Sequence, residues 1–210
     1  MIDRFLQPPM RALLAVPARA LTAGGLRADQ VTLAGLGLAI LSFVALALGW
    51  HGAGLVLIAA NRVLDGLDGA LARVQGPTDR GAFLDITADF VFYALVPLGF
   101  ALSDPPANAL AAAALLAAFI GTGTSFLAFA SVAARRGMTA ADYPAKGIYY
   151  LGGLTEGAET IAVFAAMCLW PQWFAVLAWG FAGLCLVTTA MRLHSGWTAF
   201  SAGAPERERP

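Results

Sequence analysis

Long apolar stretches separated by short polar linkers fill most of the chain. A helix that crosses a bilayer requires about 20 mostly apolar residues, and stretches of this kind lie at residues 32–50, 53–73, 81–102, 107–134, 147–170 and 172–193. The linkers after the first, third and fifth stretches are very short, which favours helical hairpins within a single bundle. The pattern therefore predicts an all-α integral membrane protein with six transmembrane helices.

The N-terminal segment has a different pattern. Apolar residues recur there in rough helical period between arginines, which is typical of a helix that lies in the membrane interface. Asp3 and Arg19 interrupt the apolar core that a secretory signal requires. We therefore divide the chain into an amphipathic interfacial arm (residues 1–31), a six-helix domain (residues 32–195) and a polar tail (residues 196–210).

The placement of lysine and arginine in the loops tests this topology independently. Cytoplasmic loops of membrane proteins carry an excess of these two residues. With six crossings, every loop that holds lysine or arginine falls on one side, together with both termini, and the opposite loops hold none. Both termini are therefore predicted to face the cytoplasm.

The composition agrees with a membrane protein and excludes other classes. Of 210 residues, 59% are hydrophobic and 12% are charged, and the mean hydropathy is +0.72, far from the values of a soluble domain. Thirteen basic residues balance thirteen acidic ones, so no excess of positive charge is available for nucleic acid. Cys168 and Cys185 lie in apolar runs, where a thiol behaves as a small hydrophobic group, so they predict no disulfide framework.

Six acidic residues lie inside the predicted spans, where each needs a partner or a function because burying a charge in a membrane is costly; they are Asp65, Asp68, Asp85, Asp89, Glu156 and Glu159. The first four form two pairs, spaced by three and by four residues, so each pair shares one face of its helix. An antiparallel hairpin brings both pairs to similar depth near the cytoplasmic end. Four carboxylates this close repel one another without a cation. They therefore predict a Mg²⁺ or Mn²⁺ site whose remaining ligands are substrate phosphates.

A specific motif covers the same aspartates. Residues 65–89 read DGLDGALARVQGPTDRGAFLDITAD, which resembles the CDP-alcohol phosphotransferase signature, a DxxDGxxAR run followed by GxxxDxxxD. The matching positions are Asp65, Asp68, Gly69, Ala72, Arg73, Gly81, Asp85 and Asp89. Residues 29–32, DQVT, are similar to the Asn-x-Val/Leu-Thr start of the first span in this family, whose members also have six spans after an amphipathic arm.

The resemblance implies a reaction and a role for each matching residue. A phosphatidyl group would move from CDP-diacylglycerol to a small polar alcohol, with release of CMP. Two divalent ions, Mg²⁺ or Mn²⁺, would be ligated by Asp65, Asp68, Asp85 and Asp89. Asp89 would also act as the general base on the acceptor hydroxyl. The nucleotide would be bound by Thr32, Asp68, Gly69, Ala72, Arg73 and Gly81.

The family also implies a setting for this reaction. We expect a multi-pass protein of a bacterial inner membrane, in contact with membrane lipids and with its active site facing the cytoplasm. A homodimer is expected as well, and Gly35 and Ala39 form a small-xxx-small pair that is compatible with a helix contact between two copies.

The identity of the acceptor stays open. Family members that use a phosphorylated acceptor have basic residues near the end of the fourth span, where residues 125–131 of this chain are mostly apolar. An anionic acceptor is therefore disfavoured. The alternatives are the reverse arrangement, in which a CDP-aminoalcohol reacts with diacylglycerol, and, in a different class, a membrane transporter that uses intramembrane carboxylates.

The two glutamates of the fifth span have two possible roles. Glu156 and Glu159 share one face of a predicted helix, and Arg62 is the basic residue that lies well inside a span. We expect either an ion pair between Arg62 and one of these glutamates, or a role for the glutamates in binding the polar or cationic part of the acceptor.

Overall fold

A computed structural model describes residues 3–138 and 153–201, and all regular secondary structure in these two ranges is helical. The helices are α1 (Asp3–Ala23), α2 (Ala28–Ala47), α3 (His51–Gln75), α4 (Asp79–Ser103), α5 (Pro105–Arg135), α6 (Gly157–Leu169) and α7 (Phe174–Ser201), and a short 3₁₀ turn, η2 (Pro171–Trp173), joins the last two. The prediction of an all-α protein is confirmed for these residues.

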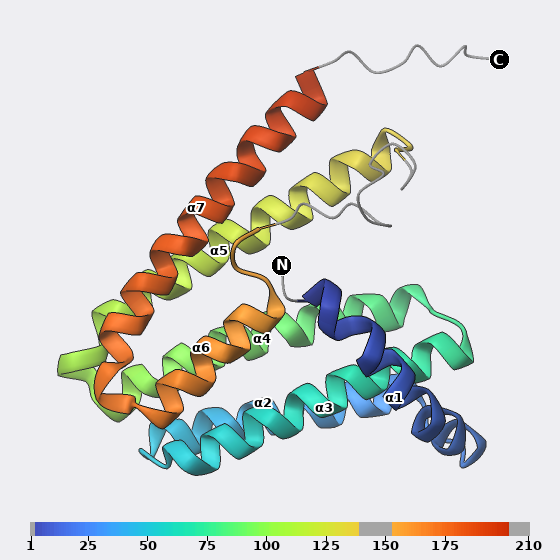
Figure 1. Cartoon of the computed structure of the whole chain (residues 1–210), viewed down its shortest axis with the longest axis horizontal. Helices are drawn as coiled ribbons and strands as arrows, with labels where there is room; N and C mark the ends of the chain where they lie inside the picture. The colour runs from blue at the N-terminus through green and yellow to red at the C-terminus, as the bar shows by residue number, and fades with distance from the viewer. Residues whose placement is uncertain (1–2, 139–152, 202–210) are drawn as a thin grey trace.

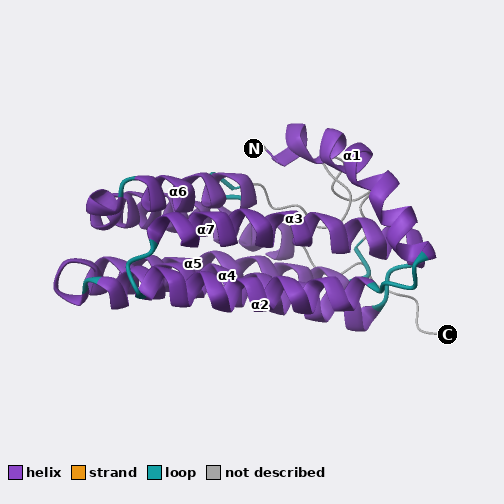
Figure 2. Cartoon of the chain, turned by 90° about the horizontal axis from the view of Figure 1, so that it is seen from below, coloured by secondary structure: helices purple, strands orange, loops and turns teal. Residues whose placement is uncertain are grey.

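Helices α2 and α3 run along the long axis of the molecule, and α5 and α7 run at an angle to them (Figure 1). Helix α1 lies obliquely against α3 at one end (Figures 1 and 2). Helix α2 packs against both α3 and α4, and α5 packs against α4 and α7. The turn between α3 and α4 lies at the same end of the molecule as α1 and the start of α2 (Figure 1). Three chain segments therefore meet at the end of the α3–α4 hairpin that carries the sequence motif.

Four segments are long and apolar enough to cross a membrane, namely Ala28–Ala47, Asp79–Ser103, Pro105–Arg135 and Pro171–Ser201. Helices α3 and α4 have the same length, but the charged residues of α4 lie in its N-terminal half, whereas those of α3 extend from Arg62 in its middle to Arg73 near its end. The described part of α6 has only 13 residues. Each of the six predicted spans thus corresponds to a helix, while the count of six crossings and the interfacial position of α1 remain predictions. Helix α7 continues to Ser201, beyond the predicted domain boundary at residue 195.

The predicted helix over residues 147–170 is wrong at residues 153–156. Residues 139–152 lie outside the described residues, residues 153–156 are not helical, and α6 begins at Gly157. This non-helical segment has hydrogen-bond partners of its own, because the Leu154 amide donates to Thr188 Oγ1 over 3.1 Å and the Thr155 hydroxyl lies 3.1 Å from the same oxygen. These contacts with α7 stabilise a conformation that a pattern of apolar residues does not reveal.

The small residues of α2 pack inside the chain. A Cβ atom on Gly35 would lie 3.7 Å from Asn61 Nδ2 and 3.8 Å from Leu64 Cβ on α3, and Ala39 is fully buried in the main core. The interpretation of Gly35 and Ala39 as a contact between two copies is therefore wrong, because α3 already covers this face. The predicted homodimer itself is not tested by this packing.

Two groups of buried apolar residues hold the bundle together. The main core contains aromatic rings contributed by α4, α6 and α7, among them the stacked pair Phe100 and Phe174 with a centroid distance of 4.6 Å. A smaller cluster, made of Ala18, Val31, Ala70 and Leu71, joins α1, α2 and α3 beside the motif. The smaller cluster fixes α2 and α3 relative to each other where the candidate site lies.

Candidate functional site

Three aspartates meet on the α3–α4 hairpin. Asp65 and Asp68 on α3 and Asp85 on α4 each offer a carboxylate oxygen, and these oxygens all lie within 4.8 Å of one another. Asp68 is buried, with 5% of its surface exposed. Such a set of hard, closely spaced oxygen donors fits a divalent cation such as Mg²⁺ or Mn²⁺. The structure therefore brings together three of the four predicted metal ligands.

Asp89, the fourth predicted ligand, is in contact with Arg62. Its Oδ1 accepts a hydrogen bond of 2.9 Å from Arg62 Nη1, and the same nitrogen lies 3.6 Å from Asp65 Oδ2. The prediction that Arg62 pairs with Glu156 or Glu159 is thus wrong. Arg62 lies one helical turn from Asp65 and faces α4, so the carboxylates of the hairpin itself are its nearest anions.

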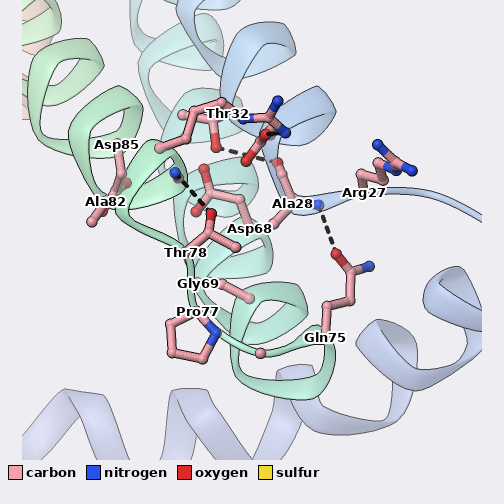
Figure 3. Close-up of a pocket in the computed structure, with 15 residues that line it drawn as sticks. Arg27, Ala28, Thr32, Asp68, Gly69, Gln75, Pro77, Thr78, Ala82 and Asp85 are labelled. Atoms are coloured by element: carbon pink, nitrogen blue, oxygen red, sulfur yellow. Dashed lines mark hydrogen bonds and ion pairs between the residues drawn. The ribbon is translucent and has the colours of Figure 1, made fainter.

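A pocket of about 390 Å³ opens beside the three aspartates, between α2, α3 and α4. Figure 3 shows Thr32, Asp68 and Asp85 around it, with Gln75 near Ala28 at its edge. Six of the residues predicted from the motif line this pocket: Thr32, Asp68, Gly69, Ala72, Gly81 and Asp85. Arg73 does not line this pocket. Its side chain lies beside Gly69, and a Cβ atom added to Gly69 would be 3.5 Å from Arg73 Nη1.

A second, much smaller cavity of about 10 Å³ continues inward from the pocket. Thr32, Asp68 and Asp85 line both spaces, while Asp65, Asp89 and Arg62 line only the inner one. A volume of this size holds about one water-sized particle. The carboxylates therefore lie between a space large enough for a substrate and a space that accommodates a single small ligand.

Two glycines shape the turn at the edge of the pocket. Gly76 follows α3 with φ at +92°, a left-handed conformation that glycine adopts without steric cost. The Gly81 amide donates to Thr78 Oγ1 over 3.0 Å, which caps α4. A Cβ on Gly81 would lie 3.1 Å from that hydroxyl and 3.3 Å from Asp29 Oδ1. The motif glycine at position 81 is thus explained by close packing at the start of α4.

Sequence reasoning missed several neutral and charged residues at this site. Gln75 accepts a hydrogen bond from the Ala28 amide, and Arg80 forms an ion pair with Asp29 across the start of α2 and α4. Asn61, which is 3% exposed, contacts Arg62 inside the bundle. The argument that polar groups inside a span need partners applies to asparagine as well as to aspartate, and it would have identified Asn61.

Glu156 and Glu159 lie at the start of α6, and neither lines the two cavities described above. The Glu156 amide donates to Glu159 Oε2 over 3.3 Å, and Glu156 Oε1 accepts from the Gly153 amide over 3.4 Å. The Glu159 carboxylate therefore accepts from the N-cap amide of α6, and the Glu156 carboxylate accepts from an amide of the segment before the helix. This position does not match the predicted face within a continuous helix.

Comparisons with known proteins agree with the motif. The family model for CDP-alcohol phosphatidyltransferase matches residues 26–192. The inner membrane protein YnjF of Escherichia coli (strain K12) is 54% identical over 197 residues, which cover 94% of this chain and 96% of that protein.

Solved structures with the same arrangement come from Mycobacterium tuberculosis phosphatidylinositol phosphate synthase (PgsA1). The crystal structure with CDP-DAG bound is 25% identical, covers 95% of this chain and all of its own chain, and superposes with a TM-score of 0.66. The structure in complex with manganese and citrate is also 25% identical, covers 93% of each chain, and has a TM-score of 0.64.

Proposed function

This chain belongs to the CDP-alcohol phosphatidyltransferase family, and we propose that it transfers a phosphatidyl group from CDP-diacylglycerol to the hydroxyl of a small polar alcohol, releasing CMP. The observation that carries this proposal is the meeting of Asp65, Asp68 and Asp85 at the inner end of a pocket that other motif residues also line, namely Gly69, Ala72 and Gly81. The transporter alternative is set aside because the family consists of transferases. The donor is supported by the CDP-DAG bound to the mycobacterial relative.

The pocket residues suit a nucleotide diphosphate. Gly69, Ala72 and Gly81 have small side chains or none, so a ligand can approach the backbone of α3 and α4 closely. Arg73, whose guanidinium lies against Gly69, is the motif residue placed to attract a diphosphate. We assign the CMP part of the donor to this pocket and its diphosphate to the end that the aspartates form.

Asp65, Asp68 and Asp85 would hold a divalent cation, Mg²⁺ or Mn²⁺, and the manganese in a relative's crystal structure supports this assignment. When bound, such an ion supplies Lewis-acid polarisation of the diphosphate and stabilises CMP as the leaving group. The second ion predicted from the family would need Asp89 as a ligand, and Asp89 Oδ1 accepts a hydrogen bond from Arg62.

We assign the role of general base to Asp89. Its carboxylate would remove the proton of the acceptor hydroxyl as the alcohol oxygen bonds to the lipid-linked phosphorus. The bond between that phosphorus and the bridging oxygen breaks, and CMP leaves with the bridging oxygen. Asp89 lines the inner cavity one helical turn beyond Asp85, so the acceptor would approach from the side opposite the nucleotide.

The setting is a bacterial inner membrane, which the name of the Escherichia coli relative and the four apolar segments support. The distribution of loop lysines and arginines favours six crossings, an interfacial α1 and an active site on the cytoplasmic side. The homodimer remains part of this proposal on the basis of the family alone.

The test measures CMP release by the full chain purified in detergent, with CDP-diacylglycerol, Mn²⁺ and a panel of alcohols, followed by identification of the lipid product by mass. We expect release that depends on one class of uncharged or cationic alcohol and is lost in Asp68→Asn. The matched control is Asp79→Asn, which changes an exposed aspartate outside the pocket and should retain activity.

Two results would overturn the assignment. CMP release by Asp68→Asn at the rate of the unchanged chain would remove the aspartates from the reaction. Release of CMP from a CDP-aminoalcohol with diacylglycerol, and none from CDP-diacylglycerol, would establish the reverse arrangement of donor and acceptor.

A further inference from the structure

Arg62 is a partly buried cation that several groups hold in one position. Its side chain is 18% exposed. Nε and Nη2 donate to Asn61 Oδ1 over 2.8 and 2.6 Å, while Nη1 donates to Asp89 Oδ1 over 2.9 Å. The guanidinium carbon lies 4.1 Å from the centroid of the Phe92 ring, within range of a cation–π interaction. The planar group is thus fixed both by hydrogen bonds at its edge and by a ring at its face.

Asn61 connects this arrangement to the neighbouring helix. It is 3% exposed, and its Nδ2 donates to the Gly35 carbonyl oxygen of α2 over 2.8 Å. The amide therefore uses its donor toward α2 and its acceptor toward Arg62. The result is a continuous set of hydrogen bonds from the backbone of α2, through α3, to Asp89 on α4.

Arg62 lies outside the family signature, which begins at Asp65, so the motif itself does not account for it. Arg62 neutralises the negative charge of Asp89, the one aspartate of the motif that does not belong to the group of Asp65, Asp68 and Asp85. A cation that used Asp89 Oδ1 as a ligand would have to compete with a guanidinium held by Asn61 and Phe92. Since like charges repel, Arg62 also disfavours a second divalent ion beside Asp89.

We propose that Arg62 is a positioning residue that takes the place of a second divalent ion at Asp89, so that the chain without substrate binds a single ion through Asp65, Asp68 and Asp85. The inference rests on the proposed function, because it takes these aspartates to be metal ligands. Asp89 is then held in one orientation as the base by a protein cation, and the hydrogen bonds of Asn61 keep that cation in place.

A purely structural role for Arg62 makes a different prediction. A buried arginine that only neutralises aspartates would affect the stability of the bundle, and its removal would leave the number of bound ions unchanged. The number of Mn²⁺ ions bound per chain therefore separates the two roles, and this number is measured without substrate and without activity.

The experiment is a Mn²⁺ titration of the purified full chain, followed by electron paramagnetic resonance and calorimetry, with thermal unfolding as a check of folding. We expect one ion per chain for the unchanged protein and for Arg62→Lys, which retains the positive charge. Arg62→Met should bind a second ion as well, and its affinity for Mn²⁺ at this second site should exceed that of the unchanged protein by at least about 10-fold. Adding Asp89→Asn to Arg62→Met should return the count to one.

Arg80→Gln is the matched control, because it removes a nearby arginine whose ion pair is with Asp29 instead of the aspartate cluster; its count should stay at one. Two ions in the unchanged chain, or one ion in folded Arg62→Met, would overturn the inference. If Arg62→Met does not fold, the counts for the unchanged chain and Arg62→Lys decide. Absence of Mn²⁺ binding together with absence of CMP release would instead refute the proposed function, whereas two ions with normal CMP release would refute this inference alone.

Discussion

The side-chain oxygen of Gln75, the last residue of α3, accepts a hydrogen bond of 3.2 Å from the backbone amide of Ala28, the first residue of α2. The Gln75 amide nitrogen donates to the Leu26 carbonyl oxygen over 2.6 Å and to Thr22 Oγ1 over 3.2 Å. One side chain thus connects the end of α1, the linker to α2 and the end of α3. Gln75 and Ala28 both line the pocket, so this connection sets its outer edge.

Gln75→Ala should therefore reduce the affinity for the donor more than it reduces the rate of the chemical step. Each lost hydrogen bond at this partly solvated position costs about 0.5–1.5 kcal/mol, so we expect a lower Tm and a KM for CDP-diacylglycerol raised about 10-fold, with a smaller change in kcat. The control is Gln172→Ala in η2, away from the pocket, which should leave both constants unchanged. Equal kinetics for Gln75→Ala and the unchanged chain would contradict a role for this connection.

Gly81 offers a test of the close packing at the start of α4. The Cβ of Gly81→Ala would lie 3.1 Å from Thr78 Oγ1 and 3.3 Å from Asp29 Oδ1, so the cap of α4 or the start of α2 must shift by a few tenths of an ångström. Small displacements of a binding site reduce catalysis strongly, and we expect kcat/KM to fall about 10-fold or more.

Gly37→Ala on α2 is the matched control for this substitution, because nothing lies within 4 Å of its Cβ position. Alanine has the higher helix propensity, so the control should keep full activity with unchanged or slightly higher Tm. A fully active Gly81→Ala would indicate that the α3–α4 turn adjusts without affecting the pocket.

The fold and the aspartate cluster could be predicted from the sequence because helical geometry is regular. Once Asp65, Asp68 and Asp85 are assigned to two antiparallel helices, the rise per residue fixes their depth and the spacing fixes their face. The partner of Arg62 could not be predicted in the same way. Several acids lie in the bundle, and the choice between Asp89 and the glutamates depends on which helix faces α3, which periodicity alone does not give.

The break before α6 shows a second limit of sequence reasoning. Residues 153–156 lie in a stretch that is apolar enough for a helix, and the hydroxyl that holds them in a non-helical conformation belongs to Thr188, 34 residues after Leu154. Such long-range hydrogen bonds leave no periodic signal in the local sequence. The same reason explains why Gln75 was missed, since its partners also lie on other elements.

The Thr188 hydroxyl should contribute to the stability of the fold more than to the rate of the reaction. It is fully buried and contacts both the Leu154 amide and the Thr155 hydroxyl. Thr188→Val keeps the shape of the side chain but leaves the partly buried Leu154 amide and the buried Thr155 hydroxyl without this partner, so we expect a loss of about 1–3 kcal/mol in the free energy of unfolding. Chemical denaturation of the purified chain measures this loss. Thr198→Val, at an exposed site on the same helix, should have little effect, and equal losses for the two variants would contradict the assigned role.

Removal and return of the metal provide the last prediction. An ion that binds the folded chain and not the unfolded one stabilises it, by about 2.7 kcal/mol at a concentration 100 times its Kd. A chain treated with EDTA should therefore gain Tm on addition of Mn²⁺, as measured by thermal unfolding in detergent. Asp68→Asn removes a buried ligand of the three-aspartate group and should lose most of this gain, whereas Asp79→Asn should keep it. If Mn²⁺ stabilises Asp68→Asn as much as the unchanged chain, the ion binds elsewhere, because a site built on three carboxylates would lose affinity when one of them becomes a neutral amide.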